Sequence, residues 1–515
     1  MLGKSFWKTA ADAPTAIALV DPNDTEWSSG RLLEDSNRLV HGLRARGLRA
    51  GDSIVTLLGN GIDIIQLTLA CTQAGWRMIP LNPRLRGREI ARIVYQSAAS
   101  AVVGSARHRR LYVAAAEGEW SPRWFTVGSD ADPDSLEAVR KDQPPDLPGD
   151  RRPGLVMTYT AGTTGDPKGV LRPTPQDIDP DTLASAYTWF LTLFGIEPLR
   201  ENVHLVVSPL CHTGVLNFAM NSLHMGHKLV LMDRWSPEGM LDRVRRHRVT
   251  TTHMVPAQFQ WLLALPETTR TAADVSSLRH VVHSAAPCAP DVKRRMLEWW
   301  GPVIYEYYAA AEGGGTLATP EDWLRKPGTV GRPWPISEIR ILDDGGNLCL
   351  PGVEGTVWLR MGGYTFEYHN DREATDATWR DGFFTVGDIG YLDGDGYLFL
   401  CDRKADVIIF GGMNVYPAEV ESMLLTHPDI VDAAVVGVPD VVWGEQVKAM
   451  VVPAPGRPTG RAAARELMAF CRKRLAHYKC PKQLDFVEAL PRDPTGKLLR
   501  RELRTPYWSQ RARNI

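Results

Sequence analysis

The 515-residue sequence has no apolar run that approaches the length of a membrane-spanning helix. It also has no excess of either charge, because 59 Lys and Arg residues stand against 60 Asp and Glu residues, for a formal net charge of −1. A chain without an excess of positive charge does not attract nucleic acid or an anionic membrane surface. We therefore expect a small-molecule partner, no nucleic acid and no integral membrane association.

Cysteine is scarce as well. The seven cysteines are odd in number and scattered, with no Cys-x-x-Cys pair, which excludes a disulfide-stapled scaffold and is typical of thiols in a reducing compartment. The charged N-terminus leads only to the short apolar run at 17–20, so no signal peptide is expected. The sequence predicts a cytoplasmic protein.

What the sequence does contain is an alternation of helical and extended patterns. Apolar residues recur at helical spacing over 32–46 and 62–74, whereas 54–58, 79–81 and 101–103 are short apolar runs typical of buried strands. This alternation predicts an α/β fold class with a largely parallel sheet. The length exceeds that of one ordinary hydrophobic core, so two or more domains are expected.

A loop rich in glycine and hydroxyl groups follows the apolar segment 154–158, for which we predict a strand that leads directly into the loop. Its glycines let the backbone approach an anion, while Thr163, Thr164 and Lys168 add donors and a positive charge. We interpret residues 159–169 as a triphosphate cradle. It is not a Walker A loop, because Gly169 stands where that motif has Ser or Thr. An ordinary Gly/Thr turn is the alternative.

This loop resembles the phosphate-binding signature of the adenylate-forming superfamily, which includes acyl-CoA synthetases, adenylation domains of peptide synthetases and luciferases. The resemblance implies a large multi-sheet α/β N-terminal domain, residues 1–403, and a small mobile α+β C-terminal domain, residues 404–515. It also implies that the chain binds ATP with Mg²⁺. The ATP-binding residues that it implies in the loop are Thr160, Gly162, Thr163, Thr164, Gly165 and Lys168.

Two further segments follow predicted strands. In open α/β sheets ligands bind beyond the carboxyl ends of the strands, and His212 follows the predicted strand at 204–209. A lone His is more often structural, but the resemblance implies that His212 gates the passage between acyl pocket and nucleotide. The small-residue turn at 284–287, which contains Ala285, would lie beneath the adenine; a tight strand-to-helix connection is the alternative.

The stretch 303–315 resembles the family motif Tyr-Gly-x-Thr-Glu. By that match Tyr308 stacks on adenine and Glu312 is the Mg²⁺ ligand, a role that suits a carboxylate near phosphates. Ala311 replaces the Thr of the motif, and Ala161 stands where the cradle usually has Ser. Two hydroxyls near the reacting phosphorus are therefore missing. Slower turnover, substitution by water and a different activated group all remain open.

A strand–turn–strand pattern spans 385–404. The resemblance implies that Asp388 accepts hydrogen bonds from the ribose hydroxyls, which a carboxylate does well, and that Arg403 contacts the nucleotide. The hinge between the domains follows at Ala405, where many family members have Asp or Lys. Beyond it, Gly411, Gly412 and Trp443 match elements that face CoA in CoA ligases.

Near the C-terminus, Lys497 lies in a Pro-Thr-Gly-Lys setting that matches the mobile catalytic lysine of the family. Without that match, a Lys on a Gly-flanked loop would be assigned to the solvated surface. With it, the predicted catalytic residues are Lys497, Glu312 and His212. A cation delivered between carboxylate and α-phosphate would stabilise the charge that develops during transfer.

The resemblance covers nearly the whole chain and implies an AMP-forming acyl-CoA synthetase of the fatty-acid–CoA ligase-like subgroup. Such an enzyme activates a carboxylic acid as an acyl-adenylate and then forms a thioester with CoA. Because of Ala161 and Ala311 we also consider a diazotase that activates nitrite for transfer to an aryl amine, loading of a carrier protein, and a nucleotide-binding relative that has lost turnover. A homodimer is a further hypothesis.

Overall fold

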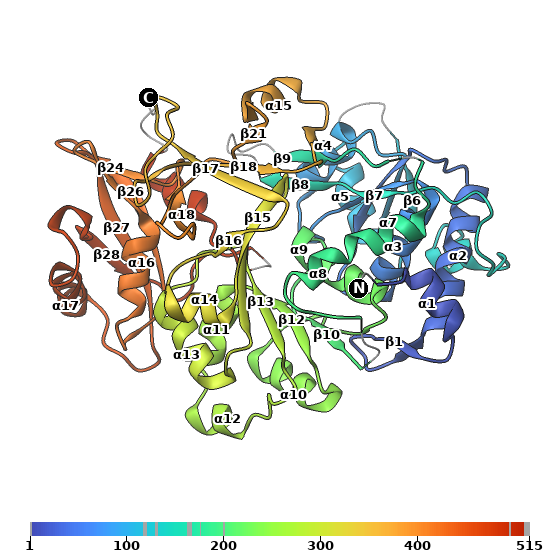
Figure 1. Cartoon of the computed structure of the whole chain (residues 1–515), viewed down its shortest axis with the longest axis horizontal. Helices are drawn as coiled ribbons and strands as arrows, with labels where there is room; N and C mark the ends of the chain where they lie inside the picture. Colours follow the sequence, from blue (N-terminus) through green and yellow to red (C-terminus); the bar gives the residue numbers. More distant parts are fainter. Residues whose placement is uncertain are drawn as a thin grey trace.

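The computed structural model describes residues 3–116, 121–128, 132–161, 167–175, 177–198, 201–493 and 496–508. Figure 1 shows mixed α/β layers, with the N-terminal part of the chain on the right and the C-terminal part on the left. The predicted fold class, a large multi-sheet α/β domain followed by a small C-terminal domain, is confirmed. In the described ranges, no helix has both the length and the apolar character needed to cross a bilayer.

The first sheet is parallel throughout, with the strand order β6-β5-β3-β4-β7. The predicted strand at 54–58 and the predicted helix at 62–74 are confirmed as β3 and α3. The elements of this region are α1 (Phe6–Asp12), α2 (Ser29–Ala45), β3 (Ser53–Leu57), α3 (Ile62–Ala74), β4 (Arg77–Pro80), α4 (Gly87–Gln96), β5 (Ala101–Gly104), α5 (Ala106–Val113), β6 (Arg123–Thr126), α6 (Leu136–Arg140) and β7 (Leu155–Val156).

The second sheet has nine strands in the order β16-β15-β14-β13-β12-β10-β11-β1-β2. Its central strands are parallel, and the strands at its two ends are antiparallel. The strands are β1 (Ile17–Val20), β2 (Glu26–Ser28), β10 (Val203–Val206), β11 (Lys228–Leu231), β12 (Thr251–Met254), β13 (His280–His283), β14 (Ile304–Ala310), β15 (Gly313–Ala318) and β16 (Arg332–Pro333). The helices between and after them are α7 (Pro180–Tyr187), α8 (Trp189–Thr192), α9 (Thr213–His224), α10 (Pro237–His247), α11 (Pro256–Leu263), α12 (Glu267–Ala272), α13 (Pro290–Trp300) and α14 (Pro320–Arg325).

One apolar core joins the two sheets. It contains side chains from α2, α3, α9 and β11, among them the fully buried Leu39, Leu69 and Leu229. Burial of each such side chain contributes about 1.5–3 kcal/mol. The core fixes α9, and therefore the segment that precedes it, against the first sheet.

The predicted strand at 154–158 is wrong in one respect, because it is two strands in two sheets. Leu155–Val156 (β7) pairs in parallel with β4, and Met157 is fully buried with its N–H on the Met78 carbonyl at 2.9 Å. The chain then enters a three-stranded antiparallel sheet of β8 (Thr158–Ala161), β9 (Pro167–Leu171) and β19 (Glu367–Tyr368). The chain therefore leaves the first sheet at Met157, before the glycine-rich loop begins.

Two smaller sheets complete the fold. The predicted hairpin at 385–404 is confirmed as β22 and β23. Their sheet comprises β17 (Ser337–Leu342), β18 (Gly355–Met361), β20 (Trp379–Arg380), β21 (Phe383–Phe384), β22 (Asp388–Leu392) and β23 (Leu398–Arg403), with α15 (Arg372–Thr378) beside it. The C-terminal domain contains β24 (Ile408–Phe410), β25 (Met413–Val415), α16 (Pro417–Leu425), β26 (Ile430–Asp440), β27 (Gly444–Pro453), α17 (Arg461–Arg472), the 3₁₀ helix η1 (His477–Lys479), β28 (Gln483–Phe486) and α18 (Arg500–Trp508).

Candidate active site

The glycine-rich loop is held at both ends by the antiparallel pair β8 and β9. Thr160 lies opposite Lys168, and Ala161 lies opposite Pro167. The predicted contacts Gly162, Thr163, Thr164 and Gly165 lie outside the described residues. Pro167 begins a strand rather than a helix, so the cradle differs in architecture from a Walker A loop.

Lys168 and Glu312, predicted from separate motifs, lie in one cluster. The Lys168 ammonium is 5.0 Å from the centre of the Tyr368 ring and 3.8 Å from the Asp371 carboxylate. The Tyr368 hydroxyl donates a 2.9 Å hydrogen bond to Glu312 Oε1, and Glu312 is only 8% exposed. Burial and the Glu312 carboxylate raise the pKa of Tyr368, so its hydroxyl keeps the proton that it donates.

Sequence reasoning missed Tyr368 and Asp371. Tyr368 belongs to β19, which pairs with β9 across almost 200 positions of sequence, and Asp371 follows three residues later. No local motif marks either residue, because their positions depend on a strand pairing between distant segments.

A second cluster joins the motif residues Tyr308, Asp388 and Arg403. Asp388 and Arg403 are cross-strand partners in β22 and β23, and the Arg403 Nε lies 3.3 Å from Asp388 Oδ1. The Tyr308 hydroxyl donates to Asp388 Oδ2 at 2.6 Å. Burial raises the pKa of Tyr308, and the Asp388 carboxylate raises it further. The structure therefore brings together the three residues that the resemblance implies at adenine and ribose.

Lys497 belongs to the C-terminal domain but interacts electrostatically with Arg403 and Asp388 of this second cluster. The residue keeps part of its surface in solvent. Desolvation of the ammonium lowers the pKa of Lys497, and the Arg403 guanidinium lowers it further, while Asp493 and Asp388 oppose that shift. The loop is seated by Gly496, whose φ is +86°. A Cβ at this glycine would lie 3.2 Å from both Ala257 and Val255 of the large domain.

His212 precedes α9 and faces the same region. Its Nε2 is buried and has no hydrogen-bond partner among the described residues. Burial lowers the pKa of His212, the nearby Asp493 carboxylate raises it, and Lys497 lowers it. The adjacent Thr213 hydroxyl donates to Thr158 Oγ1 at 2.8 Å. His212 therefore directly precedes a residue bonded to β8 and interacts electrostatically with Asp493 and Lys497.

The predicted small-residue turn has an uncommon backbone. Ala285 has φ +73°, a left-handed conformation that costs a non-glycine residue about 1–2 kcal/mol. The preceding Ser284 hydroxyl lies 3.0 Å from His253 Nε2, and the Tyr307 hydroxyl lies 3.2 Å from the same nitrogen. These contacts fix a strained turn whose Ala285 is exposed, a feature that is common at ligand sites.

The residues predicted to face CoA lie elsewhere. Gly411 and Gly412, with φ of +56° and +83°, form the tight turn between β24 and β25. The Gly411 N–H donates to the Trp443 carbonyl at 2.9 Å, and the Trp443 ring stacks on Phe410 with 5.1 Å between centroids. Figure 1 places β24 at the outer side of the C-terminal domain, apart from β8 and β9.

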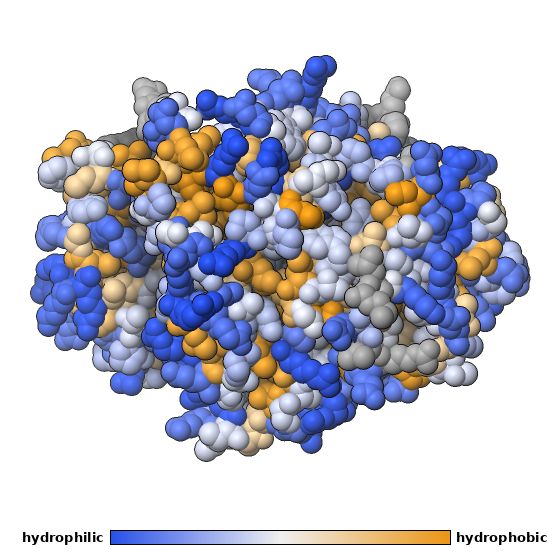
Figure 2. Space-filling model, in the orientation of Figure 1, coloured by the Kyte–Doolittle hydropathy of each residue, from blue (hydrophilic) through white to orange (hydrophobic). Residues whose placement is uncertain are grey.

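The surface around that turn is apolar. In Figure 2 apolar residues gather over the upper left of the molecule, the region of β24 and β26 in Figure 1. The exposed apolar residues of this region are Ile409, Met413, Val441, Val442 and Trp443. Single exposed apolar residues are ordinary, whereas a cluster of them marks a surface that contacts another group.

The predicted hinge residue Ala405 lies in a turn directly after β23. The Arg403 carbonyl accepts the Asp406 N–H at 2.9 Å, and the Ala405 carbonyl accepts from Arg504 at 3.2 Å. Asp402, which precedes this turn, accepts a 3.0 Å hydrogen bond from the Ala418 N–H at the start of α16, which follows it. Burial raises the pKa of Asp402 to about 6.

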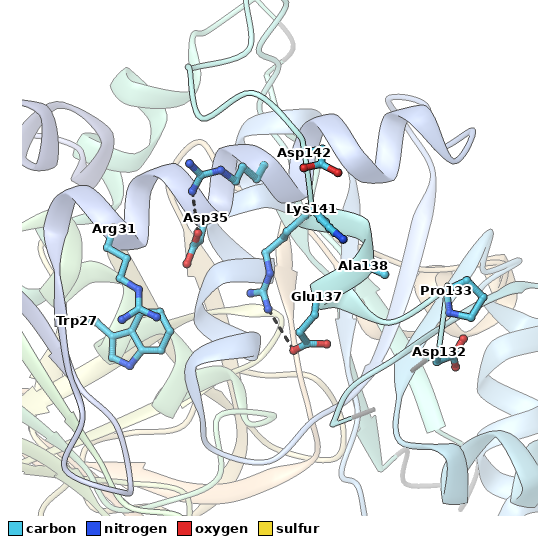
Figure 3. Close-up of a pocket in the computed structure, with 11 residues that line it drawn as sticks. Trp27, Arg31, Asp35, Asp132, Pro133, Glu137, Ala138, Lys141 and Asp142 are labelled. Atoms are coloured by element: carbon cyan, nitrogen blue, oxygen red, sulfur yellow. Dashed lines mark hydrogen bonds and ion pairs between the residues drawn. The ribbon is translucent and has the colours of Figure 1, made fainter. Parts of the chain in front are cut away.

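A surface hollow of about 620 Å³ lies between α2 and α6, outside these clusters. Two ion pairs line it, Arg38 with Asp35 at 3.0 Å and Arg140 with Glu137 at 3.2 Å, and Arg31 lies over the Trp27 ring at 3.8 Å (Figure 3). None of the site residues predicted from the sequence lines it. The hollow is therefore not the candidate active site.

Comparisons with known proteins identify the family of the chain. The profile of the family described as AMP-binding enzyme matches residues 6–369, and that of the AMP-binding enzyme C-terminal domain matches residues 419–497. The chain is 34% identical over 474 residues to a feruloyl-CoA synthase from an Amycolatopsis species, covering 91% of this chain and 92% of that protein. It is 31% identical over 512 residues to the long-chain-fatty-acid–CoA ligase FadD13 of Mycobacterium tuberculosis, covering 98% of each.

Among solved structures, the fold is similar to that of the amide bond synthetase McbA from Marinactinospora thermotolerans. The TM-score is 0.82 at 28% identity, and the match covers 98% of this chain and 99% of that chain.

Proposed function

The chain belongs to the family of AMP-binding enzymes and is an AMP-forming ligase of the acyl-CoA synthetase type; we propose that it uses the site around Lys497 to activate a carboxylic acid with ATP and then transfers the acyl group to CoA. The observation that carries this proposal is the position of Lys497. The Lys497 ammonium, from the C-terminal domain, interacts electrostatically with Arg403 and Asp388, which form an ion pair in the large domain.

In the first half-reaction a carboxylate oxygen attacks the α-phosphorus of ATP, and pyrophosphate leaves. Lys168 contacts the phosphates, Asp388 and Tyr308 hold the nucleoside, and Lys497 stabilises the negative charge that develops between carboxylate and α-phosphate. His212 separates the acyl group from the nucleotide. These roles agree with the two clusters, which come from different motifs and lie in one region.

Glu312 is the proposed Mg²⁺ ligand. The described residues contain no group of three or more His, Cys, Asp or Glu side chains that could hold an ion without help. One carboxylate fits Mg²⁺, which is usually bound by one or two carboxylates together with substrate phosphates and water. The ion would neutralise phosphate charge, and Tyr368 would orient the Glu312 carboxylate through its 2.9 Å bond.

The second half-reaction requires a different arrangement of the domains, which we propose to divide at residues 403 and 404. Rotation about the turn at Ala405 would withdraw Lys497 and bring Gly411, Gly412 and Trp443 to the site. The apolar surface around Trp443 supports this proposal, because it is exposed in the arrangement seen here. The CoA thiol would then displace AMP. The homodimer hypothesis is tested by analytical ultracentrifugation.

The acid and the acceptor are tested together by measuring pyrophosphate release. Fatty, aryl and polycyclic acids, and separately nitrite with aryl amines, are supplied with ATP in the presence and absence of CoA. We expect release with one class of acid and formation of a thioester that depends on CoA. Release with nitrite that is indifferent to CoA would contradict the ligase proposal.

A second candidate is transfer of the activated group to an amine or a carrier protein instead of CoA. Two observations support this second candidate. Alanine stands at positions 161 and 311, and a similar solved structure is named as an amide bond synthetase. A product that contains the aryl amine and no thioester would support this candidate.

Trp443→Ala tests the proposed rotation. We expect the rate of thioester formation to fall about 30-fold, since loss of a large aromatic contact at an interface costs about 2 kcal/mol or more, while adenylate formation stays within twofold. The two steps are measured separately, as ATP–pyrophosphate exchange and as CoA-dependent AMP release. Val113→Ala, at an exposed apolar residue in α5, is the control. Equal losses in both steps would contradict a role for Trp443 in the second step alone.

A further inference from the structure

Arg172 directly follows β9, four residues after Lys168, and the family motifs give it no role. Its Nη2 donates a hydrogen bond to the carbonyl oxygen of Ala311, in the turn that carries Glu312. The charged or polar groups that interact with the guanidinium at longer range are Glu312, Tyr187 and Tyr364. Arg172 therefore lies against the segment predicted to face the reacting phosphorus.

Only some of the hydrogen-bond donors of the Arg172 guanidinium have a described partner. Arginine has five N–H donors and no acceptor, whereas one described hydrogen bond, to Ala311, uses its donors. Among the described residues Arg172 forms no ion pair, and Glu312 acts on it only at longer range. Burial lowers the pKa of Arg172 because a cation is costly to desolvate without a partner. The remaining donors fit an anion that none of the described residues provides.

The position of Arg172 is also related to the two hydroxyl groups that this chain lacks at residues 161 and 311. Ala311 replaces a Thr of the family motif, and its carbonyl is the group that Arg172 contacts. Ala161 replaces a Ser and pairs with Pro167 at the start of β9, the strand that ends next to Arg172. A guanidinium at this point can donate two parallel hydrogen bonds to an oxyanion, which two alanine side chains cannot do.

We propose that Arg172 binds an oxyanion at the reacting centre and so replaces the hydrogen-bond donors that positions 161 and 311 lack. The inference rests on the proposed adenylation and assigns a residue to it. The oxyanion is either a phosphate group of ATP or the acid group of the substrate, since each offers two oxygens that accept parallel hydrogen bonds from one guanidinium. Arg172 is then a substrate-binding residue whose loss affects the first half-reaction.

The experiment compares Arg172→Gln, Arg172→Lys and Arg172→Met. Gln keeps a neutral donor for the Ala311 carbonyl, Lys keeps the charge, and Met keeps neither. Binding of ATP with Mg²⁺ is measured by calorimetry without any acid. Pyrophosphate release is then measured with the acid that gives the fastest release from the wild-type protein. Thermal unfolding reports on stability, and Arg245→Gln, at an exposed arginine of α10, is the matched control.

We expect Arg172→Gln to lower kcat/KM for pyrophosphate release about 10- to 100-fold, the effect of losing a charge-assisted hydrogen bond, and Arg172→Lys to recover part of it. Weaker ATP binding in Arg172→Gln identifies the oxyanion as phosphate. Unchanged ATP binding with a raised KM for the acid identifies it as the acid group. If Arg172→Gln matches the wild type in ATP binding and kinetics while Arg172→Met unfolds at a lower temperature, Arg172 only supports the Ala311 carbonyl and the proposal is overturned.

Restoring a hydroxyl gives an independent readout. Adding Ala311→Thr to the Arg172→Gln variant should raise kcat/KM several-fold. The same substitution in the wild-type protein should change kcat/KM by less than twofold. The proposal is contradicted if Arg172→Gln is as active as the wild type and the added Ala311→Thr does not change that activity. Because these measurements follow adenylation without CoA, they remain interpretable if the proposed thioester step is wrong.

Discussion

Replacement of Lys497 by alanine will lower the rate of adenylate formation by about 10²- to 10³-fold, the usual effect of removing one group that stabilises developing charge. ATP binding should change little, because Asp388, Arg403 and Tyr308 form their own cluster without Lys497. Pyrophosphate release gives the rate, and calorimetry with ATP gives the affinity. Lys473→Ala, at an exposed lysine of the same domain, is the control.

The lowered pKa of Lys497 also predicts how the rate of adenylation falls at alkaline pH. A lysine is charged below its pKa, and the pKa of Lys497 is lowered by burial and by Arg403. Its charge is therefore lost at a lower pH than that of an ordinary lysine, and adenylation should decline there. The Lys497→Ala variant should lack this decline. Full activity in the variant would refute the assigned role.

The largest expected effect on stability is at a buried ion pair remote from the reacting groups. The Lys293 side chain of α13 has no exposed surface, and its ammonium lies 2.7 Å from Glu306 Oε2 in β14. His283 Nε2 lies 3.4 Å from the same oxygen. Lys293→Met leaves a buried carboxylate without its partner, so we expect a loss of about 3–5 kcal/mol in the free energy of unfolding. Urea unfolding measures it.

The double variant Lys293→Met/Glu306→Gln is the matched comparison, because it removes both charges and should recover much of the loss. The pH dependence has a definite sign. Burial raises the pKa of Glu306, and removal of Lys293 raises it further, since Lys293 lowers it in the wild type. A carboxyl with a raised folded-state pKa destabilises the fold above that pKa, so the single variant should regain stability as the pH falls. Equal stability of the single variant and the wild type would show that the pair contributes nothing.

Elements with a strong local signal were predicted closely. The helix at 62–74 is confirmed with the predicted bounds, because its apolar residues and the following Gly75 determine it locally. The hairpin that carries Asp388 and Arg403 is confirmed as well, since a tight turn sets its register. The segment 154–158 was predicted as one strand because its composition is uniform, and only the competing partners β4 and β9 divide it.

The sequence by itself determined the α/β class, the family and the residues of each motif, since these depend on local patterns in the chain. Only the tertiary structure decided which motifs meet. Lys168 and Glu312 are joined by Tyr368, and Lys497 interacts electrostatically with Arg403 because its loop packs on the large domain at Gly496. Arg172 became a candidate in the same way, through its bond to a carbonyl far away in the chain. Such contacts depend on strand pairing and domain packing, and a periodicity of 2 or 3.6 residues carries no information about them.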